Sequence, residues 1–64
     1  MKIYYVNAQG KKEVQEILNL KCQILAMYPG SLLIGCTKNQ YLSILNLSSN
    51  YHWRVHENRL PVSA

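Results

Sequence analysis

The segment CQILAMYPGSLLIGCTKNQYLSILNLSSNYHW, residues 22–53, carries a single charged side chain, Lys38. Turn-forming residues divide it into apolar runs that start every nine or ten residues, at 22–28, 31–37, 41–47 and 51–57. This spacing is typical of short strands joined by hairpins, and it predicts an antiparallel β-meander. The first run has a second interpretation. Pro29-Gly30 favours a type II turn, which fits a tight hairpin poorly, so residues 22–28 form either a strand or an extension of the preceding helix.

The residues before this segment predict one strand and one helix. Residues 2–7 are rich in β-branched and aromatic side chains, which favours a strand. From Gly10 the pattern takes a helical period over about 10 residues, and its apolar stripe consists of Val14, Ile17, Leu18 and the aliphatic stem of Lys21. The complete order is β-α-β-β-β-β. The expected fold class is therefore α+β, with one short amphipathic helix packed on a curled, mainly antiparallel sheet.

Length and composition limit this fold to a single small domain, residues 1–64. A chain of 64 residues, of which 48% are hydrophobic, has material for one core. Residues 58–64 have no hydrophobic period and include Pro61, so we expect an extended or frayed tail. No stretch approaches the ~20 apolar residues of a bilayer span, and the first residues lack the apolar region of a secretory signal. We therefore expect a cytoplasmic protein that does not enter a membrane.

The apolar meander raises the main functional question. Both faces of the expected strands at 31–37 and 41–47 are largely apolar, and one short helix covers only one face of a sheet. Either the sheet curls around its own core, or the second face is buried in a homo-oligomer, or it docks on another protein. The functional expectation is a non-enzymatic protein-interaction module, a regulator or inhibitor that docks on a partner protein, with self-association as a further mode. The expected partner-binding residues are Leu33, Tyr41, Leu45 and Leu47, with Trp53 as an alternative core anchor.

The basic charge of the chain supports an alternative function, nucleic-acid binding. Seven Lys and Arg against three Asp and Glu give a formal net charge of +4, which is compatible with a phosphate-rich partner. The cations are scattered along the chain, and no signature of an RNA-recognition motif, a KH domain or a zinc finger appears. The residues that would carry this alternative are Lys11, Lys12, Arg54, His56 and Arg59.

We expect no catalytic, cofactor or metal site. The chain has no Asp, two of its three Glu residues fit a solvated helix face, and its isolated glycines form no phosphate-binding loop. On one strand His52 and His56 would lie about 13 Å apart, too far for a shared ion. Cys22 and Cys36 lack the close spacing of a zinc knuckle. We expect them as free thiols, although a bridge between them would close a loop of roughly 15 residues.

Overall fold

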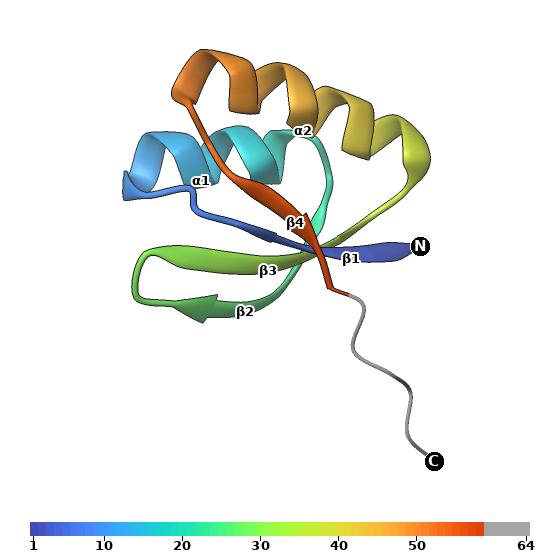
Figure 1. The fold of residues 1–64 in the computed structure, drawn as a ribbon, viewed down its shortest axis with the longest axis horizontal. Coiled ribbons are helices and arrows are strands. Elements are labelled where there is room, and N and C mark those ends of the chain that lie inside the picture. Colours follow the sequence, from blue (N-terminus) through green and yellow to red (C-terminus); the bar gives the residue numbers. More distant parts are fainter. Residues whose placement is uncertain (59–64) are drawn as a thin grey trace.

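The computed structural model describes residues 1–58, which form two helices and four strands (Figure 1). The fold class is α+β as predicted, but the element order is β-α-β-β-α-β and not β-α-β-β-β-β. The expected tail begins at Asn58, whose backbone N–H donates to the Ile3 carbonyl at 2.8 Å, and residues 59–64 lie outside the described part. The elements are β1 (Lys2–Val6), α1 (Gly10–Asn19), β2 (Gln23–Tyr28), β3 (Ser31–Cys36), α2 (Lys38–Tyr51) and β4 (Val55–Glu57).

The four strands form one antiparallel sheet in the order β2-β3-β1-β4. Helix α1 connects β1 to β2 and leaves β3 between them, while α2 connects β3 to β4 and leaves β1 between them. This is the split β-α-β connectivity of ferredoxin-like folds. Both helices lie on the same side of the sheet (Figure 1). Among residues 1–58, the opposite side of the sheet is therefore left without a helix.

Helix α2 shows that the prediction of a strand at 41–47 was wrong. The hydroxyl of Thr37 accepts the backbone N–H of Gln40, and the side-chain oxygen of Gln40 accepts the backbone N–H of Thr37. This reciprocal pair is a capping box, which satisfies two backbone donors at a helix start. The polar residues 38–40, interpreted as a turn, are thus the first turn of a helix. The residues of α2 that pack on the core recur at helical intervals: Tyr41, Ile44, Leu47 and Tyr51.

The predicted curl of the sheet was also wrong, for the same reason. The sheet is open, with β2 and β4 as its two edges. Curling was expected because strands at 31–37 and 41–47 would each have had two largely apolar faces, and one short helix covers only one face of a sheet. Residues 41–47 are instead part of α2, which directs Tyr41, Ile44 and Leu47 to the core and leaves Leu42 and Leu45 exposed. The strand expected at 51–57 is correspondingly short, since Tyr51 ends α2 and β4 contains three residues.

The other expected elements are confirmed. The strand at the start, the helix from Gly10 and the strands on either side of Pro29-Gly30 all form, so residues 22–28 contribute a strand. The core lies between the sheet and the two helices. Trp53 belongs to it, as the alternative interpretation expected, and its indole N–H donates to Glu13 Oε1 at 2.6 Å. The buried hydrophobic residues are Tyr4, Val6, Ala8, Ile17, Cys22, Leu32, Ile34, Cys36, Ile44 and Trp53.

Candidate interaction surface

Side-chain alternation along the strands gives the sheet two different faces. Tyr4, Val6, Leu32 and Ile34 point toward the helices and are buried. The residues between them point to the side that neither helix covers. We call this surface the open face. It consists of Ile3 and Tyr5 of β1, Gln23, Leu25, Ala26 and Tyr28 of β2, Ser31, Leu33 and Gly35 of β3, and His56 of β4.

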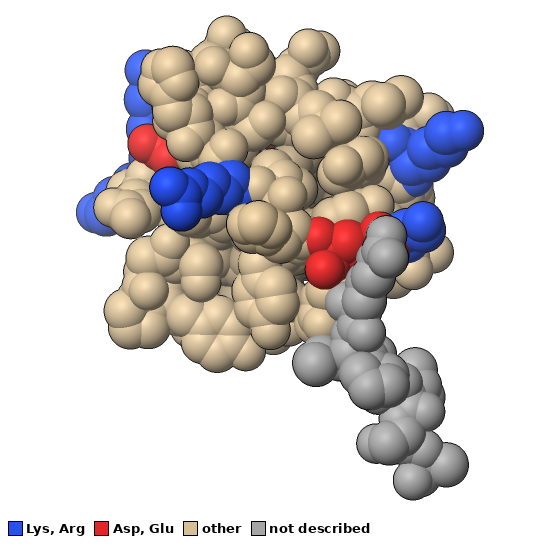
Figure 2. All heavy atoms as spheres, in the orientation of Figure 1, with Lys and Arg blue, Asp and Glu red and all other residues tan. Residues whose placement is uncertain are grey.

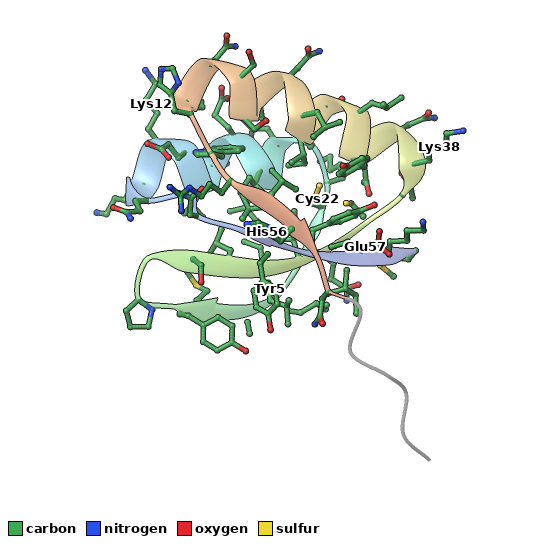
Figure 3. All side chains as sticks on the ribbon, in the orientation of Figure 1. Tyr5, Lys12, Cys22, Lys38, His56 and Glu57 are labelled. Carbon is green, nitrogen blue, oxygen red and sulfur yellow. The ribbon has the colours of Figure 1, made fainter. Side chains whose placement is uncertain are left out.

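Tyr5 lies at the centre of the open face. The strand register places Leu33 opposite it on β3 and His56 opposite it on β4. The Tyr5 ring also lies near the ring of Tyr28, with centroids 6.3 Å apart and planes tilted by 42°. Figure 3 shows Tyr5 on the side of the sheet away from the helices. The centre of the open face is therefore aromatic and aliphatic.

Strand β2 completes one side of the open face. The register between β2 and β3 shifts between Ile24 and Ala26, which is typical of a β-bulge and places Leu25 beside Ala26 on the same face. A Cβ atom at Gly35 would lie 3.7 Å from Leu25 Cδ1 and 2.6 Å from Met1 Sδ, so both side chains lie over the β3 backbone. Leu25 is 43% exposed. The missing side chain at Gly35 thus leaves room for accessible apolar groups.

The open face contains no Lys, Arg or Glu residue. Figure 2 shows Lys and Arg toward the two ends of the molecule, with Glu side chains beside them at both ends, and an uncharged region over β2 and β3. Lys12 lies at one end, on the first turns of α1, and Lys38 lies at the other, at the start of α2 (Figure 3). The electrostatic pattern is therefore an uncharged centre between two basic ends.

The structure distributes the expected partner-binding residues over different surroundings. Leu33 lies on the open face, half-buried beside Tyr5. Tyr41 lies on the side of α2 that faces the sheet, and its ring stacks on Tyr4 with centroids 4.4 Å apart. Leu47 of α2 also packs against the core. Leu45 is exposed on α2. The four residues do not form one surface, because Tyr41, Leu45 and Leu47 lie on a helix and not on a strand beside Leu33. They were grouped on the expectation of a strand at 41–47.

Three of the five residues expected for nucleic-acid binding lie at the same end of the molecule. Glu13 and Trp53 are hydrogen-bonded to each other, and they directly follow Lys12 and directly precede Arg54 in the sequence, so the two cations lie close to this bond. Lys11 is in the same first turn of α1 as Lys12. The backbone N–H of Arg54 is hydrogen-bonded to Asn7 Oδ1. Of the remaining members of that set, His56 is on the open face and Arg59 is outside the described residues.

A cavity of about 610 Å³ opens where β1, β3 and β4 meet the start of α2. Its walls include Tyr4, Cys36, Lys38, Tyr41 and Glu57. Burial raises the pKa of Tyr4, and the nearby Cys36 and Glu57 add to this increase. Burial also raises the pKa of Cys36. Both groups are therefore protonated at neutral pH, which is the form that does not act as a nucleophile.

The part of the chain that the structure describes has neither a metal-ligand cluster nor a helix able to span a membrane. Residues 1–58 contain no group of three or more His, Cys, Asp or Glu side chains that could hold a metal ion. Within the same range, neither helix has the length and apolarity needed to cross a membrane.

Comparison of the chain with protein-family models, curated proteins and solved structures finds no match.

The open face was not predicted from the sequence, although the alternation of side chains along its first strand can be read there. The run Lys2–Val6 alternates, with Ile3 and Tyr5 on one side and Tyr4 and Val6 on the other. What the alternation does not give is the strand order, which brings β1 between β3 and β4. The bulge that adds Leu25 to the surface has no clear sequence signal of its own.

Proposed function

We propose that this protein is a non-enzymatic interaction module, a small regulator or inhibitor that docks its open face on a partner protein. The observation that carries the proposal is the contrast between the faces of the sheet. One face is sealed by α1 and α2, while the open face presents accessible apolar side chains and no Lys, Arg or Glu. Contiguous exposed apolar patches on small proteins mark interaction sites.

The chemistry of the open face favours a protein over a nucleic acid. Nucleic-acid affinity comes largely from Lys and Arg that neutralise phosphates. On this molecule Lys12 and Arg54 lie at one end and Lys38 lies at the other, away from Tyr5 at the centre. A backbone of phosphates crossing the open face would therefore pass over an uncharged surface. An apolar protein surface has no such requirement.

The basic ends also indicate the chemistry of the partner. The formal charge of the chain is +4, and its cations flank the open face without entering it. The complementary surface has an apolar centre that covers Tyr5 and Leu33, hydrogen-bond acceptors near the Tyr5 and Tyr28 hydroxyl groups, and Asp or Glu at its rim. Such rim charges accelerate association and suppress wrong partners more than they raise affinity.

The size of the open face limits the affinity. Four strands about 4.8 Å apart and about five residues long cover roughly 300 Å² in projection. Stable interfaces bury about 800 Å² on each partner. Docking through the open face alone is therefore expected to be transient, with a Kd in the micromolar range, unless the partner also reaches the basic ends.

The proposal is tested by site-specific cross-linking followed by binding measurements. A photoreactive amino acid is placed at Leu33 and, as a matched control, at Leu42 of α2, which is 54% exposed. The protein cross-linked from position 33 and not from position 42 is then purified and titrated with each variant. We expect Leu33→Glu to weaken binding at least about tenfold and Leu42→Glu to leave it within about threefold. Circular dichroism checks that both variants fold.

Two outcomes would overturn the docking proposal. One is equal loss of affinity in Leu33→Glu and Leu42→Glu. The other is the absence of any cross-linked protein specific to position 33, together with sedimentation that shows a monomer at micromolar concentration. If the species cross-linked at position 33 is a second copy of the chain, the partner is the protein itself, and Leu33→Glu should then convert the dimer to a monomer.

Nucleic-acid binding is the second candidate function, and the grouping of Lys12 with Arg54 is the observation that favours it. A single-stranded nucleic acid would contact these cations and stack a base on Tyr5 beside His56. An electrophoretic shift assay at two salt concentrations tests this candidate. It predicts a steep loss of affinity with salt and a further loss in Arg54→Gln, whereas the docking proposal predicts no shift at physiological salt.

A further inference from the structure

Cys22 and Cys36 form a pair of buried thiols that docking through the open face does not use. Cys36 ends β3, and Cys22 immediately precedes β2. Both cysteines are free, and Cys22 is 6% exposed while Cys36 is 2% exposed. Both belong to the hydrophobic core on the helix-covered side of the sheet.

The strand register brings the two cysteines opposite each other. Gln23 pairs with Gly35 and Ile24 pairs with Ile34, so extending the register by one residue places Cys22 opposite Cys36. Directly opposed residues in antiparallel strands have Cα atoms about 4.5 to 5.5 Å apart. Disulfides join Cα atoms that are about 4.4 to 6.8 Å apart. The backbone separation expected from this pairing therefore suits a bridge without a change of fold.

One of the two thiols borders a space that a small reagent can enter. Cys36 lines the cavity of about 610 Å³ at the start of α2, together with Lys38 and Tyr41. Cys22 is not among the residues that line it. Cys36 is therefore the thiol that lies beside a space able to hold the reagent, and Cys22 lies opposite it on the neighbouring strand, where it can complete the exchange.

We propose that Cys22 and Cys36 are a reversible dithiol–disulfide pair, oxidised through Cys36 by small-molecule disulfides such as oxidised glutathione. Cys36 Sγ, as the thiolate, attacks one sulfur of the reagent, so a mixed disulfide forms and one small thiolate leaves. Cys22 Sγ, after losing its proton, then attacks Cys36 Sγ and displaces the second small thiolate. The protein gives two electrons to the reagent, and the two thiol protons end on the two released small thiols.

The core slows this exchange without preventing it. Burial raises the pKa of Cys22 to about 11, and the neighbouring Cys36 adds to the increase. Burial raises the pKa of Cys36 as well, so the thiolate form of both is scarce at neutral pH. Because the thiolate is the attacking species, the rate of oxidation should rise as the pH increases from 7 toward 9.

The bridge would fasten the edge strand β2 to β3 while leaving the open face unchanged. Both sulfurs lie on the helix-covered side, whereas Leu25 and Leu33 lie on the other. Closing a loop of roughly 15 residues restricts the unfolded chain, and for a domain of this size we expect Tm to rise by roughly 10 °C or more. Oxidation should therefore change stability, with little effect on docking.

The test uses the purified chain with oxidised glutathione at pH 8, followed by acid quench, alkylation of remaining thiols and mass spectrometry. The expected product is a monomer that has lost two hydrogen atoms, takes up no alkylating reagent and has a raised Tm that dithiothreitol reverses. Cys22→Ala should instead stop at the mixed disulfide on Cys36, and Cys36→Ala should react more slowly than the parent chain. The mass of the parent chain alone decides the main point, even where a variant folds poorly.

Three results would overturn the proposal. They are a stable mixed disulfide on the parent chain, a covalent dimer as the main product, and unreacted thiols after the reagent has oxidised the unfolded chain completely. Since none of these readouts involves a partner, their failure is independent of docking through the open face.

Discussion

The two faces of the sheet carry similar apolar residues, but one face is buried and the other is partly exposed. Leu33 and Ile34 are neighbours on β3, but Ile34 is completely buried under the helices, whereas Leu33 is half-buried beside Tyr5 on the open face. The difference comes from coverage, since α1 and α2 both pack on the side that carries Ile34. Apolar character alone therefore does not distinguish the core of this protein from its candidate interaction surface.

The largest expected effect comes from truncating these two neighbours in turn. Ile34→Ala should lower the free energy of unfolding by about 2 to 5 kcal/mol, because it removes buried methyl groups and leaves a cavity. Leu33→Ala should lower it by less than about 1 kcal/mol, because that side chain remains partly in water. Urea denaturation of both variants measures the difference. Equal losses would show that the open face is part of the core.

Raising the pH should lower the free energy of unfolding through Cys22, which lies in the core on the helix-covered side of the sheet. Burial raises the pKa of Cys22 to about 11, from 9.0. A pKa that is raised on folding gives stability that is complete below the unfolded value and is lost as the pH passes through the folded value. We expect the free energy of unfolding to fall by about 1 to 2 kcal/mol between pH 9 and pH 11. In Cys22→Ala this part of the fall should be missing.

The capping box at Thr37 begins α2, one of the two helices that cover the buried face of the sheet, and its contribution to stability can be measured. Thr37→Ala removes the hydroxyl that accepts the Gln40 backbone N–H, so we expect a loss of about 1 kcal/mol in the free energy of unfolding. Thr37→Ser retains the hydroxyl and should lose much less. Thermal denaturation followed by circular dichroism compares the two variants. A Thr37→Ala variant as stable as the parent would mean that α2 does not depend on this capping box.

A smaller effect is expected where α1 meets the segment before β4. Glu13 Oε1 accepts the indole N–H of Trp53 and the backbone N–H of Gln9. Glu13→Gln keeps an acceptor but removes the charge, and we expect a loss of about 0.5 kcal/mol with a change in the fluorescence of Trp53. The matched control is Glu16→Gln on the same helix. If the two variants have the same stability and fluorescence, the Glu13 bond contributes nothing measurable.

The parts of the fold predicted from sequence are those with strong local signals. The alternation at the start of the chain, the helical period from Gly10 and the Pro29-Gly30 turn each depend on neighbouring residues. Helix α2 was missed because spaced turn-forming residues resemble hairpin connections. The sequence Thr37-Lys-Asn-Gln40 nevertheless carries a readable capping-box pattern. Weighing that pattern against the spacing would have predicted the helix.

The candidate site was harder to predict because it depends on pairing between distant segments. Leu33 was identified from its own strand, and it does lie on the open face. Tyr41 and Leu47 were assigned to a surface, but the turn of α2 directs them to the core. Tyr5 becomes central only once β1 is placed between β3 and β4, and no local pattern determines that order.

Calorimetry with the cross-linked partner is the sharpest test of whether the open face docks an apolar protein surface. Titrations at several temperatures and two salt concentrations give the heat-capacity change and the salt dependence of binding. Docking through the open face should give a negative heat-capacity change, which marks apolar burial, and weak dependence of Kd on salt. Both the binding and this signature should be lost in Leu33→Glu and retained in Leu42→Glu. A heat-capacity change near zero, with affinity that falls steeply as salt is added, would rule out docking of an apolar protein surface on the open face.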